Sequence, residues 1–422
     1  MKRVLILHVF GALLATMAQG ATSFELAAKA TNELGVDLHR QLATGGENLC
    51  ISPYSIDSAL AMTFAGADGE TRSEMARVLH FPNGGDLPAS FSALQQSLEQ
   101  MRAKTAELVK ESKKFGGPSE RITLNIANRL FAQKGYHFRD VFLSLVKQNF
   151  GGAFEPIDFV ADPAAATQRI NKWVADQTRD RIRDLIPGGA LDKTTRLVLA
   201  NALYLKAPWA SEFSQNATHP EPFHVHAGTP VDVSMMRKTD RNFGYARRDG
   251  FTVVSVPYVG NELQFVVLLP DDINGLPGLE SKLSGDVLTS CAKLQKREEI
   301  DLHLPKFKLE PPTITLAKQF EALGMKTAFD QPKGSANFDR IAPRTPDDYL
   351  YISQIFHKTF MAVDEKGTEA AAATAVAMLA GSALRSPPPP PIEVKVDRPF
   401  VYAIQHVPSG VCLFLGRVTD PR

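Results

Sequence analysis

Leucine and alanine recur at every fourth position between residues 23 and 42, a spacing that places them on one face of a helix. The residues of this stripe are Leu26, Ala30, Leu34, Leu38 and Leu42. The pattern predicts an amphipathic helix over 23–42.

A second helix is predicted from Ser52-Pro53 to Phe64, because apolar residues again recur at helical spacing and proline suits a first helical turn. Gly66 and Gly69 interrupt it. Thr71 followed by Glu74 has the spacing of a capping box, which predicts the start of a short helix.

Further along, strand and helix patterns mix. Residues 122–131 read as a strand and 165–185 as a helix. Residues 196–205 are almost uninterruptedly apolar, which is typical of a strand in the middle of a sheet covered on both faces.

Two hairpins are predicted in the second half of the chain. Residues 251–257 and 263–269 flank a Gly-Asn turn, and residues 394–407 and 411–418 flank a Pro-Ser-Gly turn. Helices dominate early and strands late, and no internal repeat is present. The order favours the α+β class over a doubly wound sheet, in one large unit.

The first twenty residues form a separate segment. A basic Met-Lys-Arg start precedes an apolar stretch, and small residues follow up to Gly20. This order predicts a signal peptide over 1–20 and a secreted mature chain over 21–422, extracellular or periplasmic. The apolar stretch is short for a membrane anchor, which needs about 20 residues.

Charge and cysteine content exclude several functions. The 47 basic and 46 acidic side chains balance, so composition suggests neither nucleic acid nor a membrane as partner. Cys50, Cys291 and Cys412 are too few for a disulfide framework and fit no zinc spacing, so we expect free, buried thiols. We expect no cofactor and no metal.

A cluster of lysines between residues 102 and 121 has two interpretations. Lys110, Lys113 and Lys114 could form a weak polyanion site. Acidic residues lie between them, so a solvated helix end is favoured.

Residues 365–391 carry the candidate function. They read EKGTEAAAATAVAMLAGSALRSPPPPP, with small residues first and five prolines last. Proline stiffens an extended chain and donates no amide hydrogen. Between two strand-like regions the segment is a long loop, and such loops in compact folds are usually functional or disordered.

If this loop became a strand, its side chains would alternate between two faces. One face would hold Thr368, Ala370, Ala372, Thr374, Val376 and Met378. The only charge after Lys366 in the small-residue stretch, Glu369, falls on the other face, so the segment could enter a sheet without burying a charge on a core. Composition alone favours a flexible alanine-rich linker or a helix over an inserting strand.

Ordered motifs along nearly the whole mature chain resemble those of the serpin family. Residues 48–56 read NLCISPYSI, residues 201–209 read NALYLKAPW with Leu205 where phenylalanine is usual, and residues 364–375 read DEKGTEAAAATA. Further matches are Asn171-Lys-Trp-Val174 with Thr178, Ile182 and Leu185, then Phe213, 304–307 (LPKF), 323–325 (LGM), His357-Lys358, 398–400 (RPF), 413–418 (LFLGRV) and Pro421.

The resemblance implies a serpin fold with three β-sheets, about nine helices and an exposed reactive-centre loop near 365–391. It also implies irreversible suicide-substrate inhibition of serine proteases. The protease would form an acyl-enzyme with the loop, and the loop would then insert into the large sheet and trap it. The protein would not be an enzyme, and the family is usually monomeric.

Site roles follow from the same resemblance, position by position. The hinge would comprise Glu365, Gly367, Thr368, Glu369, Ala370, Ala371, Ala372 and Ala373. The shutter, a polar cluster where the sheet opens, would comprise Ser52, Ser55, Asn201 and His357. The breach, where the loop enters the sheet, would contain Trp209 and Lys306, the latter paired with Glu365.

The scissile bond has two candidates. Counting seventeen residues from Glu365, the insertion length usual in the family, gives Gly381-Ser382, which suits a protease that accepts small residues, such as an elastase or subtilisin type. Arg385-Ser386 is a trypsin-like alternative. It would leave about 13 Å of slack at about 3.3 Å per residue, which favours the first bond for inhibition.

Two rival functions remain. One is a non-inhibitory serpin with a carrier, chaperone or storage role, against which the small hinge residues argue. The other is a serine hydrolase using Ser52 and His357, but the sequence contains no GxSxG elbow and no HExxH motif.

Overall fold

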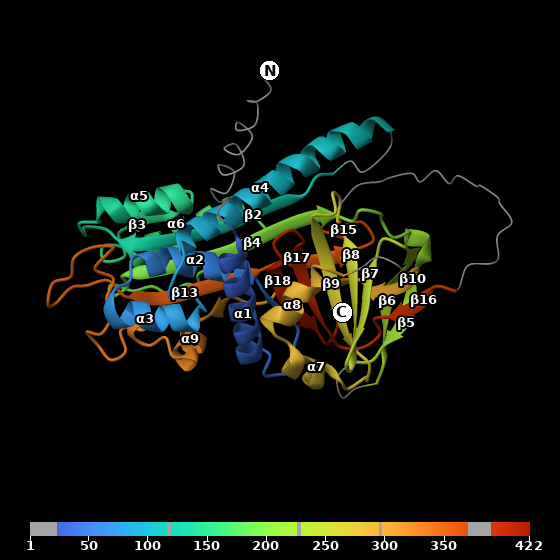
Figure 1. Cartoon of the computed structure of the whole chain (residues 1–422). Coiled ribbons are helices and arrows are strands. Elements are labelled where there is room, and N and C mark those ends of the chain that lie inside the picture. Colours follow the sequence, from blue (N-terminus) through green and yellow to red (C-terminus); the bar gives the residue numbers. More distant parts are fainter. Residues whose placement is uncertain (1–22, 116–119, 226–228, 295–297, 370–389) are drawn as a thin grey trace, which may run out of the picture.

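The structure is a computed structural model that describes residues 23–115, 120–225, 229–294, 298–369 and 390–422. Within these ranges the chain forms nine α-helices and three β-sheets (Figure 1). The helices are α1 (Glu25–Leu42), α2 (Pro53–Ala65), α3 (Gly69–Val78), α4 (Leu87–Ser112), α5 (Asp140–Asn149), α6 (Pro163–Gln177), α7 (Leu276–Lys282), α8 (Gly285–Cys291) and α9 (Ala317–Leu323).

The largest sheet has eight strands and contains the candidate site. Its strands are β2 (Thr123–Gln133), β3 (Phe154–Ile157), β4 (Leu197–Pro208), β11 (Phe307–Leu309), β12 (Ile314–Thr315), β13 (Ile352–Thr359), β14 (Met361–Asp364) and β15 (Gly367–Thr368). The long strand β4 pairs antiparallel with β2 on one side. On its other side it pairs parallel with β13 and then antiparallel with β15.

Two smaller sheets lie beside it, in the right half of Figure 1. The six-stranded sheet contains β1 (Leu49–Ile51), β7 (Gly244–Arg248), β8 (Phe251–Pro257), β9 (Leu263–Pro270), β17 (Phe400–His406) and β18 (Val411–Val418). The four-stranded sheet contains β5 (Thr218–Phe223), β6 (Val231–Asp240), β10 (Ile300–Pro305) and β16 (Ile392–Lys395).

The large sheet separates two hydrophobic cores. Strand β4 alternates between them: Leu199 and Leu203 belong to the main core with α1 and α2, whereas Val198 and Ala202 belong to a smaller core under α6. This alternation is the pattern expected of a strand covered on both faces. It therefore explains the nearly unbroken apolar run in the sequence.

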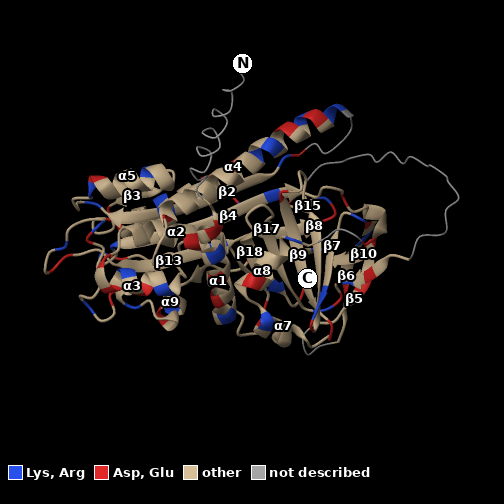
Figure 2. Ribbon diagram, viewed as in Figure 1, with Lys and Arg blue, Asp and Glu red and all other residues tan. Residues whose placement is uncertain are grey.

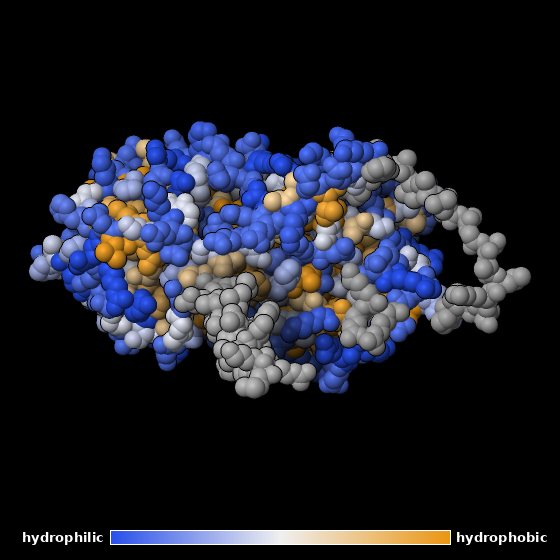
Figure 3. Space-filling view, turned by 45° about the horizontal axis from the view of Figure 1, so that its top comes forward, coloured by the Kyte–Doolittle hydropathy of each residue, from blue (hydrophilic) through white to orange (hydrophobic). Residues whose placement is uncertain are grey.

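The outer surface is largely polar. In Figure 3 hydrophilic residues cover most of the visible face, with small hydrophobic areas between them. Among the described residues the exposed large apolar side chains, Leu108, Val141, Val160 and Ile273, come from separate elements. Within the described ranges we find no helix long and apolar enough to cross a membrane.

Most predicted elements are confirmed. The helix over 23–42, the strands over 122–131 and 196–205, and the hairpin of β8 and β9 all form at or within one to three residues of the predicted bounds. The three cysteines are free and buried, as expected.

The predicted capping box at Thr71 is wrong. The helix α3 begins at Gly69, so Thr71 lies inside its first turn. The hydroxyl of Thr71 accepts from the Asn337 amide at 3.0 Å, and the Glu74 carboxylate accepts from the Thr327 amide at 2.8 Å. Both side chains therefore hold a distant segment rather than cap their own helix.

Two predicted elements are too long. The helix predicted over 165–185 ends at Gln177, because Arg179 and Asp180 adopt left-handed backbone conformations with φ of 52° and 60°. The strand predicted over 394–407 is two strands in different sheets. Pro399, which cannot donate to a strand ladder, lies between β16 and β17.

Candidate functional site

The hairpin of β14 and β15 is the structural basis of the candidate site. Val363 faces Thr368 and Asp364 faces Gly367 across the hairpin, and β15 pairs on its other side with the end of β4. Strand β15 thus lies between β4 and β14. Over residues 197–203 of β4, before the part that pairs with β15, β4 pairs directly with β13.

Gly367 is required at this junction. Its φ is 149°, and a Cβ at this position would lie 2.2 Å from the carbonyl oxygen of Ala207 on β4. Any side chain would therefore push β15 away from β4.

Thr368 is the last strand residue before the chain leaves the sheet, and its side chain points into the main core. It is 1% exposed, and its Oγ1 lies 2.5 Å from the hydroxyl of Tyr258. The Tyr258 ring stacks on Trp209, with ring centroids 4.6 Å apart. The Trp209 indole in turn donates to the carbonyl of Asp364 at 2.9 Å. The predicted breach tryptophan therefore binds the hairpin of β14 and β15 that carries the hinge residues.

Glu365 lies at the turn of the hairpin and is only 6% exposed. Its carboxylate lies 2.8 Å from the Lys306 ammonium and accepts from the Thr218 hydroxyl at 2.9 Å. Burial acts to raise the pKa of Glu365, but the hydrogen bonds from Lys306 and Thr218 outweigh it, so the pKa lies below its ordinary value. The carboxylate is therefore held charged at neutral pH.

Glu369 marks the point where the chain leaves the sheet. Its φ of 49° is left-handed, which is strained for a residue with a side chain. Its amide donates to the Ala362 carbonyl at 2.8 Å, and its carboxylate pairs with Arg181. Burial raises the pKa of Glu369 although Arg181 opposes this effect. The remaining predicted hinge residues, Ala370, Ala371, Ala372 and Ala373, lie outside the described residues.

The four predicted shutter residues come together where β4 pairs with β13, at the start of α2. Asn201 on β4 is in register with His357 on β13. The His357 Nε2 accepts from the Ser52 amide at 3.0 Å, and the Ser52 hydroxyl caps α2 by accepting from the Ser55 amide at 3.2 Å. The start of α2 is thereby anchored to the large sheet.

Two of these buried side chains have unsatisfied polar atoms. Among the described residues, neither Nδ2 nor Oδ1 of Asn201 has a hydrogen-bond partner, and the same holds for Nδ1 of His357. Burial lowers the pKa of His357 to about 3, so the ring is neutral. Unpaired buried polar groups are costly, and they lie where the two strands meet.

Sequence reasoning missed several site residues. Asn128 on β2 is in register with Asn201 and binds Ser55, with 2.5 Å between its Oδ1 and the Ser55 hydroxyl. Tyr258, Thr218 and Arg181 contact the hinge but come from distant parts of the chain. The only sequence signal for Asn128 is a polar residue within a predicted strand.

Other predicted sites are not all described. The two candidate scissile bonds, Gly381-Ser382 and Arg385-Ser386, lie outside the described residues, as does the predicted signal peptide over 1–20. The predicted polyanion site lies at the end of α4, where Lys110 pairs with Glu107 at 3.3 Å and Lys114 with Glu111 at 2.9 Å. Figure 2 shows the two charges alternating there, which favours a solvated helix end.

Comparison with known proteins identifies the class. A model of the family described as serpin (serine protease inhibitor) matches residues 29–421. Leukocyte elastase inhibitor A of Rattus norvegicus is 36% identical over 381 residues, which span 89% of this chain and 93% of the relative. An uncharacterized serpin-like protein of Thermococcus kodakarensis is 35% identical over 395 residues, spanning 93% of this chain and 85% of the relative.

Solved structures agree with this class. A highly specific serpin of the insect Tenebrio molitor superimposes with a TM-score of 0.75 at 29% identity, covering 96% of this chain and 100% of that one. The chain belongs to the serpin family. The predicted fold, with three sheets and about nine helices, is confirmed.

Proposed function

We propose that this serpin is an irreversible suicide-substrate inhibitor of serine proteases that traps its target by inserting the cleaved loop into the eight-stranded sheet. The observation that carries the proposal is the position of β15, which already pairs with both β4 and β14. The residues that follow Thr368 could extend β15 between β4 and β13 if these two strands separated.

The register of β15 with β4 supports such an extension. Thr368 faces Ala207. Thr374 is six residues beyond Thr368, and Asn201 is six residues before Ala207. An inserted strand that kept this register would therefore place Thr374 opposite Asn201, on the same face of the sheet.

The register with the other neighbouring strand leads to the same position. Thr368 faces Val363, and His357 is six residues before Val363. Insertion would thus place the Thr374 hydroxyl between Asn201 and His357, which both have unsatisfied polar atoms in the uninserted state. New hydrogen bonds there would favour the inserted state.

Side-chain alternation also supports insertion. Residues that share the face of Thr368 would point into the main core, and in the sequence from Ala370 to Met378 these are small or apolar. Glu369 would point to the other face, where Arg181 already pairs with it. No charge would therefore enter the core.

The chemistry needs only the target's own nucleophile. The protease serine attacks the carbonyl carbon of Gly381, the bond to the Ser382 nitrogen breaks, and that nitrogen leaves as an amine after taking a proton. The remaining ester joins the protease to Gly381. Insertion then carries this ester to the far end of the sheet, where hydrolysis stalls.

We propose Gly381-Ser382 as the inhibitory bond and a protease that accepts small residues as the target. The relatives named leukocyte elastase inhibitors support this class of target. Arg385-Ser386 remains the alternative. Its four additional residues would add about 13 Å of slack to the tether and weaken the distortion of the protease.

The decisive experiment mixes the mature protein with an elastase, a subtilisin, a chymotrypsin and a trypsin. We expect a covalent complex that survives denaturing electrophoresis with the elastase or the subtilisin. The mass of the released C-terminal peptide identifies its first residue as Ser382 or Ser386. Cleavage without a complex across the panel, and without a rise in melting temperature, would instead support a non-inhibitory serpin.

Variants at two positions, 368 and 372, test insertion. T368R places a long cation at a position that is 1% exposed, so we expect cleavage without complex formation. T368S keeps the hydroxyl and should retain the complex. A372R makes the same test further along the loop, at a position that would face the core only after insertion. Complex formation by A372R would contradict the proposal.

We also propose that the protein is secreted, on the basis of residues 1–20 alone. Expression of the full chain should release a protein whose N-terminus lies near residue 21. N-terminal sequencing of the released protein checks this, and retention of Met1 in the mature protein would contradict it.

A further inference from the structure

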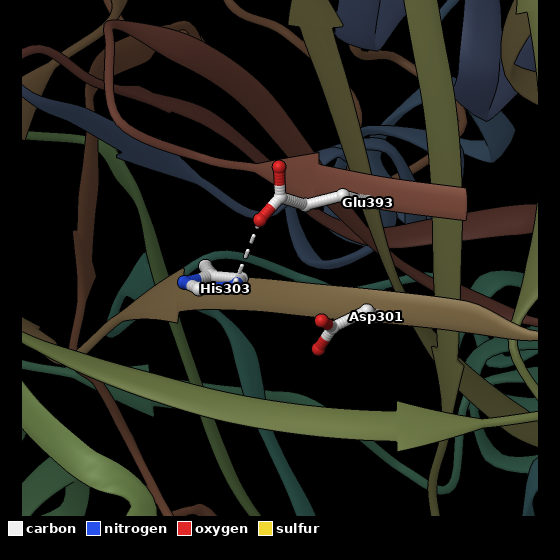
Figure 4. Close-up of side chains that lie close together, drawn as sticks. All are labelled: Asp301, His303 and Glu393. Carbon is white, nitrogen blue, oxygen red and sulfur yellow. Dashed lines mark ion pairs between the residues drawn. The ribbon is translucent and has the colours of Figure 1, made fainter. Parts of the chain in front are cut away.

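The four-stranded sheet carries a polar cluster on the face that points away from the main core. Alternate residues of β10, such as Leu302, face the main core. Asp301 and His303 lie on the opposite face, yet they are only 5% and 4% exposed. Glu393 on the neighbouring strand β16 is in register with Asp301 (Figure 4).

The tautomer of His303 follows from its contacts. Its Nδ1 lies 3.1 Å from both carboxylate oxygens of Glu221 on β5. A charged carboxylate only accepts hydrogen bonds, so Nδ1 carries the hydrogen. In the neutral ring Nε2 then presents a lone pair. Nε2 is buried without a hydrogen-bond partner among the described residues, and its nearest ionic neighbour is a Glu393 oxygen 3.8 Å away.

The repulsion between this lone pair and a carboxylate oxygen is removed either by a proton on Nε2 or by a metal ion between the two atoms. One ligand atom from each of Asp301, His303 and Glu393 lies within 4.8 Å of the other two. A Zn²⁺ ion binds nitrogen and carboxylate oxygen at about 2.0–2.2 Å, so small side-chain rotations would bring all three atoms into its coordination shell. The Nδ1 contact with Glu221 matches the outer carboxylate that orients most metal-binding histidines.

We propose that Asp301, His303 and Glu393 form a binding site for a divalent transition-metal ion, with Zn²⁺ as the best match. Glu221 is a positioning residue that holds the His303 tautomer. Imidazole favours zinc and related ions, whereas Mg²⁺ and Ca²⁺ prefer oxygen ligands alone. Three protein ligands leave a fourth position for water.

Two cations compete with the metal for these ligands. Arg237 donates to Asp301 at 2.6 and 3.0 Å, and Lys395 lies 3.2 Å from Glu393. Thr239 also donates to Asp301, at 3.2 Å. Metal binding must displace part of this network, so removal of Arg237 should strengthen metal binding. A purely structural ionic cluster gives no reason for the Zn²⁺ affinity to rise when Arg237 is removed, so this rise distinguishes a metal site from such a cluster.

The site would also have a mechanical effect. Glu393 lies on β16, which begins at Ile392, directly after residues 365–391. A metal shared by β10 and β16 would fix the C-terminal end of that segment to the sheet. Amide exchange over Ile392–Lys395 should therefore slow when the ion binds.

The test is calorimetric titration of the metal-free, full-length mature protein with ZnCl₂. We expect one ion per chain with micromolar affinity and no binding of MgCl₂. H303A and E393Q should each weaken binding at least about tenfold, and E221Q by about tenfold. R237Q should tighten it several-fold. H219A, an exposed histidine on β5, is the matched control and should change nothing.

Cobalt supplies a second readout. Co²⁺ bound to the same atoms should give visible absorption that H303A removes. If H303A does not fold, E393Q carries the test, because the Glu393 side chain is 54% exposed and can be replaced without disturbing the core. Absence of Zn²⁺ binding below millimolar concentration, or binding that both variants retain, would overturn the proposal.

Discussion

The hydroxyl of Tyr258 and Oγ1 of Thr368 lie 2.5 Å apart inside the core, so the first residues of the loop are already held by the body of the protein. Tyr258 follows β8, whereas Thr368 ends β15. Their contact joins the six-stranded sheet to β15 in the large one.

A double-mutant cycle should measure this contact. Y258F and T368V each leave one buried hydroxyl without its partner, so each should lower the free energy of unfolding by about 1–2 kcal/mol. The double variant should lose less than the sum, with a coupling of about 1 kcal/mol. Denaturant unfolding provides the values. Y402F, whose hydroxyl binds the Leu49 carbonyl instead, should show no coupling to T368V.

The ion pair of Glu365 and Lys306 should matter more than an exposed pair. K306A removes the cation from a buried carboxylate that keeps its hydrogen bond from Thr218, and we expect a loss of about 1 kcal/mol at pH 7, moderated by the partial exposure of Lys306. K308A, which breaks an exposed pair with Glu310, should change stability little. Equal losses in the two variants would refute this ranking.

The pH dependence of that pair has a definite sign. The pKa of Glu365 is lowered in the folded state, so its contribution is complete above its unfolded value near 4.5 and is lost as the pH falls through the folded pKa. The difference between wild type and K306A should therefore shrink below pH 4.5. Unfolding curves at pH 7 and in steps below 4.5 check it.

His357 should destabilise the fold in acid. Its folded pKa of about 3 lies below the ordinary 6.5, so the unfolded chain takes up a proton that the folded protein cannot. Stability from this group is complete above pH 6.5 and falls on acidification, by about 1.4 kcal/mol at pH 5.5. H357Q should abolish this part of the pH dependence, whereas H219Q should keep it.

The comparison must be between variants, because another buried group acts in the opposite direction. Burial raises the pKa of Asp57 to about 8, so its contribution to stability decreases as the pH rises toward that value. The wild-type curve alone mixes both effects. An unchanged slope in H357Q would show that His357 is not the group responsible.

Thr374 should contribute only after cleavage of the loop. If its hydroxyl reaches Asn201 and His357 on insertion, T374V should reduce the stability gained on cleavage by about 1 kcal/mol. T374S should keep the gain. Melting temperatures of cleaved and uncleaved protein give the answer, and an identical gain in T374V and wild type would place Thr374 elsewhere.

Local patterns predicted the elements well, because periodicity reports which faces are buried. The hinge and shutter positions came from motifs resembling the family, and the structure places Ser52, Asn201 and His357 together. Long-range partners could not be predicted in this way. Glu74 has the spacing of a local cap but binds Thr327, since a carboxylate can satisfy any amide that the fold brings near.

The residues of the proposed metal site were missed for the same reason. Asp301 and His303 alternate along a strand, which the sequence does show, but Glu393 joins them only through the parallel pairing of β10 and β16. No spacing rule connects residues so far apart in the chain.

The pairing of β1 with β18 has a consequence for biosynthesis. Strand β1 precedes the other strands of this sheet in the chain and β18 follows them; every residue of β18 is buried, and residues 415–417 lie between β1 and β17. Because β18 follows the other five strands of this sheet in the chain, the sheet cannot close until β18 has left the ribosome. A premature stop that removes β18 should therefore yield a chain that chaperones and proteases retain, whatever the sequence of residues 365–391.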